Sequence, residues 1–500
     1  MSSLKSHFNR ISVLIGTLLL IALLYQPVFG HLGTFPIRMW DESRLAVNAY
    51  EMYRDGDIIV TRFGESPDRW NTKPPLLIWC QALCMKIFGP GEFALRLPSA
   101  MATFLTCCFL LFFCSKYLKK YWLGFIAVLF LITATGYVRE HGTRTGDYEA
   151  MLALFTTLSY LFFFIFLETN KKKYLYYFFI GLALGVLTKS VSCLIFLPGL
   201  AVYILCQKKL LYLLKNRDFY IGLGIFLILV FGYYITRELV GPGYLKTVYG
   251  NELGGRFLHV QDEHNHNGWY YITNFIKQNR FAFSWTIPTG LLIGLLSKDQ
   301  KVKRLTLYSF IMIIGYTLFI SISKTKLNWY DHPLYPFLAI LAGLFCYTIF
   351  DLINKIPASK HQLIFNILPF VFLFVVFKQP YQKIFNMTNS PVESKWGADF
   401  YRVSYFLRDG LRGKKDLNGY TIIVEAYEPQ IFFYTNILCD RGVKLKKTFV
   451  SGLTTANNVI ASKPQHHEYI KENFEYEITY HDKNLIVYNL TAKQKIELSQ

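Results

Sequence analysis

Acidic and basic side chains cluster in a few polar segments that alternate with long apolar runs. The first such segment reads WDESRLAVNAYEMYRDGD, in which Asp41, Glu42 and Arg44 stand close together. A carboxylate in this position either caps a short helix and pairs with its neighbour or takes a proton from a polar acceptor as a general base. Spacing alone leaves both interpretations of Asp41 open, and it puts Asp41 and Arg44 on one helix face.

A lysine stands before two prolines in the sequence TKPPLLIW. The prolines favour extended backbone at Lys73 and hold its ammonium at the start of the next helix. An ammonium at the level of the lipid headgroups either binds a phosphate or is a snorkelling side chain that extends from the apolar region to the headgroups. The sequence does not separate these two roles.

Two further polar segments supply charges beside apolar runs. In REHGTRTGDYEAMLALF, Arg144 and Asp147 stand three residues apart immediately before an apolar run. Lys189 follows in the short tip LTKS. A lysine there opposes the usual distribution of positive charge and requires an anionic partner, for which a phosphate and Asp147 are candidates.

The two last polar segments before the C-terminal region are rich in histidine and aromatic residues. The segment HVQDEHNHNGWYYI is either a solvated loop or a site for a divalent metal, Zn²⁺ or Mg²⁺, although its spacing matches no closed metal motif. Its candidate ligands are His259, Asp262, Glu263, His264 and His266. The segment SISKTKLNWYDHPLYP brings Lys326 and Tyr330 to the mouth of an apolar run. An interfacial aromatic belt explains Tyr330 but not its charged neighbours.

Long apolar runs must position these polar segments. Of the 500 residues, 53% are hydrophobic and only 17% are charged, which is outside the range of ordinary soluble domains. Runs of about 18 to 22 residues can cross a hydrocarbon core of roughly 30 Å as helices, and we count about eleven of them. They lie near residues 11–29, 93–113, 121–138, 148–167, 174–188, 190–206, 219–236, 281–297, 305–322, 333–350 and 361–378. The sequence therefore predicts a polytopic α-helical membrane protein.

The net charge of +20 indicates orientation in a membrane, and we expect no nucleic-acid partner. Lysines and arginines gather in alternate short connections, on the same side as Lys5 and Arg10, which is the positive-inside pattern. The first apolar run is too long for a signal peptide and no cleavage site follows it, so we expect an uncleaved first span and a cytoplasmic N-terminus. All the polar segments considered above then face outward.

The composition changes near residue 380 and divides the chain in two. We expect a transmembrane catalytic domain over residues 1–379, with amphipathic helices in its outer loop 30–92, and a small extracytoplasmic α/β domain over residues 380–500. In the second part YTIIVEA, NNVIAS and NLIVYNL read as strands and FYRVSYFLRDGLRG reads as a helix that ends at glycine. This domain contains no P-loop and no dinucleotide fingerprint, so we expect no nucleotide cofactor.

Taken in order, the polar motifs resemble those of the GT-C class of glycosyltransferases. The motifs are WDESRLA, TKPPLLIW, ALRLPSA, RTGDYEAMLALF, LTKS, HNGWYYI and SKTKLNWYDHPLYP. They look most like the branch that contains the bacterial lipid A aminoarabinose transferases and the protein mannosyltransferase-like enzymes. Each motif is weak by itself, whereas the ordered set, over roughly residues 10–350, is specific.

The resemblance implies a role for each candidate residue. Asp41 would be the catalytic carboxylate, Lys73, Arg96 and Lys189 would hold the donor phosphate, and His266 would occupy the position of a metal-binding histidine. The remaining residues that would line the cavity or contact the acceptor are Glu42, Arg44, Arg144, Asp147, Lys326 and Tyr330. The chain departs from the family at Ser190, Gly268, Asp331 and His332, positions that bear on the metal and acceptor assignments.

The implied activity is transfer of a sugar from a polyprenyl-phosphate donor. The resemblance also implies inversion at the anomeric centre of the sugar. The acceptor would be a lipid of the lipid A type, a glycan or a protein at the outer face of the cytoplasmic membrane. The alternatives are a transporter or flippase for a lipid-linked sugar and a binding scaffold. A transporter usually has ionisable groups at mid-membrane and internal repeats, whereas the charges here stand at the ends of apolar runs.

Overall fold

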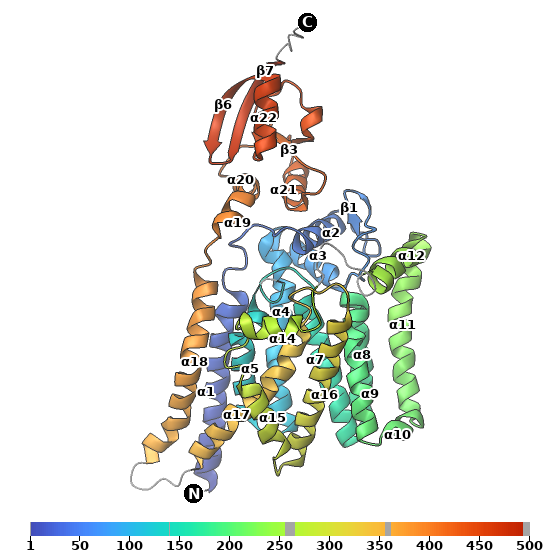
Figure 1. Ribbon diagram of the computed structural model, residues 1–500, viewed down its shortest axis with the longest axis vertical. Helices are drawn as coiled ribbons and strands as arrows, with labels where there is room; N and C mark the ends of the chain where they lie inside the picture. Colours follow the sequence, from blue (N-terminus) through green and yellow to red (C-terminus); the bar gives the residue numbers. More distant parts are fainter. Residues whose placement is uncertain (1, 140, 256–265, 356–361, 494–500) are drawn as a thin grey trace.

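The computed structural model describes residues 2–139, 141–255, 266–355 and 362–493. The chain is mostly helical. Long helices lie side by side in one part of the molecule, and a small sheet lies beyond their far end (Figure 1). The helix α1 (Ser2–Phe29) begins at the opposite end of the molecule from this sheet. The predicted class, a helical membrane protein with a small C-terminal α/β part, therefore agrees with the fold.

Seven helical segments within the described residues are long and apolar enough to cross a membrane. They are Ile11–Phe29, Glu92–Tyr117, Glu149–Thr169, Lys172–Cys206, Arg217–Val240, Gln300–Ile322 and His332–Asn354. Three shorter apolar helices are α3 (Leu76–Phe88), α5 (Tyr121–Thr133) and α15 (Thr286–Leu295). Each of the seven overlaps an expected run, whereas the count of eleven spans stays a prediction.

The spanning segments contain the long helices α4 (Glu92–Phe112), α7 (Glu149–Thr169), α11 (Arg217–Val240), α16 (Gln300–Ile322) and α17 (Tyr335–Asn354). A further long helix is α18 (Gln362–Asn389). Short ones are η1 (Phe113–Tyr117), α6 (Thr135–Val138), α10 (Leu210–Leu214), α12 (Tyr244–Val248), η3 (Tyr249–Gly255), α14 (Tyr270–Lys277) and η4 (His332–Leu334).

The chain direction reverses within Lys172–Cys206, at the LTKS segment where the sequence predicts a turn between two apolar runs. α8 (Lys172–Lys189) ends at Ser190, whose φ of 50° is left-handed, and the 3₁₀ helix η2 (Ser190–Phe196) leads into α9 (Leu197–Cys206). A Cβ on Gly185 would lie 2.2 Å from the Cys193 sulfur. Eight residues of straight helix would separate the two by about 12 Å, so the chain folds back and Lys189 lies at the turn.

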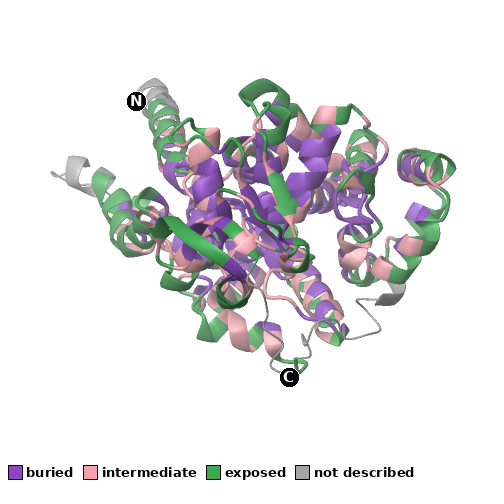
Figure 2. Cartoon of the chain, turned by 90° about the horizontal axis from the view of Figure 1, so that it is seen from above, coloured by how far each residue is buried: buried purple, intermediate pink, exposed green. Residues whose placement is uncertain are grey.

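Apolar side chains on the outside of the helical part are exposed. Seen from above, buried residues concentrate toward the middle of the molecule and exposed residues toward its margin (Figure 2). On α11 the exposed fractions of Ile228 and Leu239 are 74% and 77%. Apolar surface of this extent on spanning helices is suited to contact with lipid chains.

The first polar segment forms two helices and a small hairpin beside the ends of the long helices. α2 (Asp41–Asp55) buries Leu45, Ala49 and Met52, as their helical spacing predicts. β1 (Arg62–Phe63) and β2 (Ser66–Pro67) form the hairpin, and α3 begins after Pro75. One expectation is wrong: the N-cap position of α2 is Trp40, with φ 73°, and Asp41 is the first helical residue.

The C-terminal part is a five-stranded sheet with helices. Its strand order is β4-β3-β5-β7-β6, with β3 parallel to β4 and β5, and β7 antiparallel to β5 and β6. The strands are β3 (Thr421–Ile423), β4 (Lys446–Thr448), β5 (Val459–Ala461), β6 (Phe474–Asp482) and β7 (Leu485–Lys493). The helices of this part are α19 (Lys395–Phe400), α20 (Arg402–Leu411), α21 (Pro429–Asp440), the 3₁₀ helix η5 (Val450–Gly452) and α22 (Pro464–Asn473).

The three predicted strands and the predicted helix in this part are confirmed as β3, β5, β7 and α20. α18 runs through the expected domain boundary at residue 380 and ends at Asn389. Sequence reasoning gave no prediction for β4, β6, α21 and α22.

The C-terminal part packs directly on the chain that leads into α2. The Ile37 N–H donates to the Tyr434 hydroxyl (2.9 Å), and the Met39 N–H donates to the Tyr401 hydroxyl (2.9 Å). The Trp40 and Tyr427 rings stack with centroids 5.9 Å apart. These contacts fix the start of α2, and therefore the position of Asp41, from the side opposite the spanning helices.

Candidate active site

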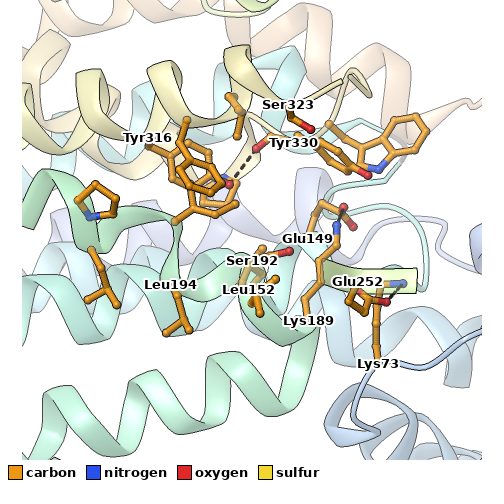
Figure 3. Close-up of a pocket in the computed structure, with 18 residues that line it drawn as sticks. Lys73, Glu149, Leu152, Lys189, Ser192, Leu194, Glu252, Tyr316, Ser323 and Tyr330 are labelled. Atoms are coloured by element: carbon orange, nitrogen blue, oxygen red, sulfur yellow. Dashed lines mark hydrogen bonds and ion pairs between the residues drawn. The ribbon is translucent and has the colours of Figure 1, made fainter. Parts of the chain in front are cut away.

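A pocket of about 490 Å³ opens where α7, α8 and α16 approach the first polar segment (Figure 3). One end of the pocket is polar and contains Lys73, Glu149, Lys189 and Glu252. The other end is formed mainly by apolar side chains of η2, α9 and α16, which include Leu194, Ile195, Leu197, Pro198, Phe319 and Ile320. A pocket built in this way suits a ligand that joins an anionic group to an apolar chain.

Lys189 forms an ion pair at the polar end of the pocket. Its ammonium donates to the carboxylate of Glu149, and only 9% of the Lys189 side chain and 4% of the Glu149 side chain are exposed. The ammonium also lies over the Tyr330 ring, 5.2 Å from its centroid. Lys189 thus has an anionic partner, as expected, but that partner is Glu149 rather than Asp147.

Lys73 forms the second ion pair of the pocket. Its Nζ lies 3.4 Å from Oε1 of Glu252, which comes from η3 in the polar segment after α11. The Thr72 hydroxyl donates to the same oxygen (3.3 Å), and the ammonium lies 5.6 Å from the centre of the Tyr148 ring. The prolines after Lys73 hold it ahead of α3, as the sequence predicts.

Asp41 is exposed and is the first residue of α2. Its negative charge is one of those that act on His141, Tyr148 and Lys189. Asp41 does not line the pocket, but these shared electrostatic neighbours place it near the polar end.

A histidine that sequence reasoning did not select stacks on Trp329, a residue of the pocket lining. The Nδ1 atom of His141 lies 3.0 Å from Oδ2 of Asp147, and its ring stacks on Trp329 at 3.7 Å. The Thr145 hydroxyl donates to Asp147 (2.6 Å) and accepts the His141 backbone N–H (2.8 Å). Burial lowers the pKa of His141, but the carboxylate of Asp147 outweighs it and raises the pKa to about 9.

The geometry gives Arg96 and Glu42 a supporting position outside the pocket. Arg96 donates through Nε and Nη2 to the two Glu42 carboxylate oxygens (2.7 and 2.8 Å), and its remaining donors bond to three backbone carbonyls. The N–H groups of Arg38 and Gly146 also donate to Glu42. Burial raises the pKa of Glu42, but Arg96 outweighs it, so the pKa lies below its usual range. This buried pair joins α2 to α4.

Arg44 also has a partner other than the expected one. Its guanidinium binds both carboxylate oxygens of Asp68 (2.8 and 2.7 Å) and lies over the Phe63 ring at 4.4 Å. Arg44 therefore fixes the hairpin after α2 through Asp68.

Among the remaining expected cavity residues, Tyr330 belongs to the pocket lining, and Arg144 and Lys326 do not. Arg144 contacts the Pro27 carbonyl (3.4 Å), and Lys326 donates to the Ser323 carbonyl (2.6 Å). Burial lowers the pKa of Arg144 to about 10, and Arg96 contributes to this shift. Among the positions that depart from the family, Asp331 is buried and pairs with Arg280 (3.1 Å).

Of the five candidate metal ligands in the sequence, the structure describes one, His266. His266 is exposed and its ring stacks on Tyr270 with centroids 4.0 Å apart. His259, Asp262, Glu263 and His264 lie outside the described residues. Within the described chain no group of three or more His, Cys, Asp or Glu side chains is arranged to hold a metal ion.

Sequence comparison identifies relatives among carrier-dependent glycosyltransferases. Residues 72–235 match the family described as dolichyl-phosphate-mannose-protein mannosyltransferase. An undecaprenyl phosphate-alpha-4-amino-4-deoxy-L-arabinose arabinosyl transferase from Aeromonas hydrophila is 28% identical over 317 residues, which cover 61% of this chain and 55% of that protein. One from Shewanella sediminis is 26% identical over 375 residues, which cover 72% and 64%. The chain thus matches little more than half the length of the Aeromonas relative.

Structural comparison extends the likeness to nearly the whole chain. ArnT from Cupriavidus metallidurans, solved with bound undecaprenyl phosphate, matches with a TM-score of 0.69 and 14% identity over 96% of this chain and 98% of that one. The archaeal oligosaccharyltransferase AglB from Archaeoglobus fulgidus, solved with an inhibitory peptide and a dolichol-phosphate, matches with a TM-score of 0.51 and 11% identity, covering 97% and 75%. The chain has the ArnT fold, and its resemblance to the lipid A aminoarabinose transferase branch is confirmed.

Proposed function

We propose that the chain is a glycosyltransferase that moves a sugar from a polyprenyl-phosphate donor to an acceptor at the outer face of the cytoplasmic membrane. The observation that carries the proposal is the pocket itself, with two lysines at one end and an apolar lining at the other. A polyprenyl phosphate has this pattern, a phosphate attached to a long hydrocarbon. The names of the Aeromonas relative and of the ligand bound to ArnT support the same carrier class.

The chemistry follows from where charge develops. The bond between the anomeric carbon and the phosphate oxygen breaks, and its electron pair stays on the phosphate. The acceptor oxygen forms the new bond to the anomeric carbon from the opposite face, which inverts that centre. Lys73 and Lys189 stabilise the negative charge that grows on the leaving phosphate. Asp41 takes the proton when the acceptor is a hydroxyl, and an ionised phosphate acceptor needs no base.

The acceptor is a lipid of the lipid A type, a glycan or a protein, and it approaches from the side of Asp41. Contacts of the C-terminal part with residues 37–40 support this direction, because they form a wall above the start of α2. Glu42 and Arg96 hold that wall in place, and Arg44 holds the hairpin beside it. The proposal assigns Arg144, Asp147, Lys326 and Tyr330 to the acceptor side of the site.

The membrane arrangement belongs to the proposal as well. Eleven spans, a cytoplasmic N-terminus and an extracytoplasmic part after residue 379 place the pocket on the outer side, where lipid-linked sugars are used. The positive-inside pattern of the short connections supports this orientation.

A divalent metal near His266 would be a further component. The single described ligand does not make a metal site, so no step above depends on a metal. The segment 256–265 holds the other candidate ligands.

Lipid analysis of cells with and without the protein tests the function. We expect a glycan or glycolipid mass to disappear without the protein while a polyprenyl-phosphate sugar accumulates. If the glycan or glycolipid mass disappears while the donor accumulates only in the inner leaflet, the protein is a flippase instead.

A further inference from the structure

One of the two lysines proposed to bind phosphate is paired with a carboxylate that the chain itself supplies. Glu252 lies 3.4 Å from the Lys73 ammonium, and both side chains line the pocket and are about nine-tenths buried. Figure 3 shows the two side chains in contact, with the dashed line that joins them. A phosphate bound to Lys73 would meet this carboxylate at short range, where two negative charges repel each other.

The segment that carries Glu252 packs on the loop that carries Lys73. The Tyr244 hydroxyl of α12 donates to the Thr72 carbonyl (2.7 Å), and the Asn251 amide donates to the Arg69 carbonyl (3.1 Å). Glu252 belongs to a seven-residue π-helical turn, a rare conformation that occurs frequently at functional sites. Glu149, the partner of Lys189, lies instead in the first turn of the long, largely buried helix α7. Of the two carboxylates, Glu252 is on the element that can move at lower cost.

The two forms of the carrier differ in charge. The sugar donor is a phosphodiester with one negative charge. The product is a phosphate monoester, which carries about 1.5 to 2 negative charges at neutral pH because its second pKa is near 6. A site with two lysines therefore binds the spent carrier more strongly than the donor, and rapid turnover requires a means to release it.

We propose that Glu252 competes with the carrier phosphate for Lys73 and thereby promotes release of the spent carrier. This inference rests on the proposed function. The donor phosphate displaces the carboxylate when it binds, and no bond is made or broken in this exchange of ion-pair partners. After transfer, the carboxylate returns to Lys73 and the polyprenyl phosphate leaves. Glu252 is thus a positioning residue that acts through Lys73.

The experiment measures binding of undecaprenyl phosphate to the full chain in nanodiscs. We expect Glu252→Gln to bind it roughly tenfold more tightly than wild type, because the amide keeps the shape but no longer neutralises Lys73. Glu477→Gln removes the same charge from the exposed strand β6 and should leave the Kd unchanged. Lys73→Ala should weaken binding, and Glu252→Gln should add nothing in that background, since the effect passes through Lys73.

The outcomes separate the inference from the function on which it rests. If wild type and Lys73→Ala both fail to bind undecaprenyl phosphate, the proposed function fails. If wild type binds and Glu252→Gln binds equally well or more weakly at an unchanged melting temperature, Glu252 is a structural partner of Lys73 and the inference is wrong. If Glu252→Gln lowers the melting temperature, the Glu252→Asp variant is measured in its place. Its shorter side chain should reach Lys73 less well, so this variant should bind the carrier more tightly than wild type. Unchanged binding would refute the inference.

Discussion

Paired charges set the chemistry of the pocket at the residue scale. Lys73 and Lys189 each have a carboxylate beside them, and so does His141. Such pairing lets cations remain charged in a poorly hydrated site, where isolated charges are costly. It also means that an anionic ligand exchanges one negative partner for another rather than entering a vacant positive site.

The His141–Asp147 pair predicts a pH dependence of stability. Burial lowers the pKa of His141, but the nearby carboxylates raise it from 6.5 to about 9. Asp147 contributes most of this increase, and Asp41 and Glu149 add to it. The stabilisation is therefore complete below pH 6.5 and is lost as the pH rises through 9. We expect the wild-type free energy of unfolding to fall by roughly 3 kcal/mol over this range because of this group.

Thermal melts of wild type and His141→Gln between pH 6 and 10 measure the effect. The substituted protein should be less stable at pH 6.5, and the difference should shrink by pH 9.5. A difference that stays constant with pH would mean that His141 is not protonated in the folded protein.

Element positions explain why some site residues were predictable and others were not. Lys73 was found because two prolines fix the start of α3, and Lys189 because it interrupts an apolar run. Glu149 and Glu252 were missed because their partners are separated from them by 40 and 179 positions, which spacing along the chain does not report. His141 could have been noticed from its segment HGTRTGD, where histidine and aspartate stand near each other before a span.

Breaking the ion pair between Glu42 of α2 and Arg96 of α4 should lower the stability of the fold rather than weaken ligand binding. Arg96→Met leaves Glu42 buried without its cation, which costs roughly 3 to 5 kcal/mol. We expect a large fall in melting temperature, and partial recovery when Glu42→Gln is added, because the double variant buries no unpaired charge.

Melting temperature and undecaprenyl phosphate binding, measured on both variants, separate the two roles of Arg96. If Arg96→Met keeps the wild-type melting temperature but binds the carrier more weakly, Arg96 is a phosphate-binding residue and not a structural one.

At the scale of the whole molecule, the spanning helices were the most predictable part. Their length and apolar composition are properties of single segments, and all seven long helices overlap expected runs. The contact of the C-terminal part with the chain before α2 was not predictable, because it joins residues near 37–40 to residues beyond 400. That contact is what completes the wall above Asp41.

The topology predicts that the C-terminus lies outside the cytoplasm. A C-terminal alkaline phosphatase fusion should be active and a fluorescent-protein fusion at the same position dark, because the proposed arrangement has eleven spans after a cytoplasmic N-terminus. The reverse pattern would mean an even number of spans and would place the pocket on the wrong side for an outward-facing transferase.

The central claim is that Asp41 and the paired lysines act together on a lipid-linked sugar, and transfer by purified protein tests it most directly. The measurement is the rate of sugar transfer from a polyprenyl-phosphate donor in nanodiscs by wild type and Asp41→Asn, with melting temperatures recorded in parallel. Asparagine keeps the size of the side chain at the first position of α2, so stability should change little, whereas loss of the base should slow transfer to a hydroxyl acceptor by about 10²- to 10⁴-fold. If Asp41→Asn transfers the sugar at the wild-type rate, Asp41 is not the base and the proposed site is wrong at its centre.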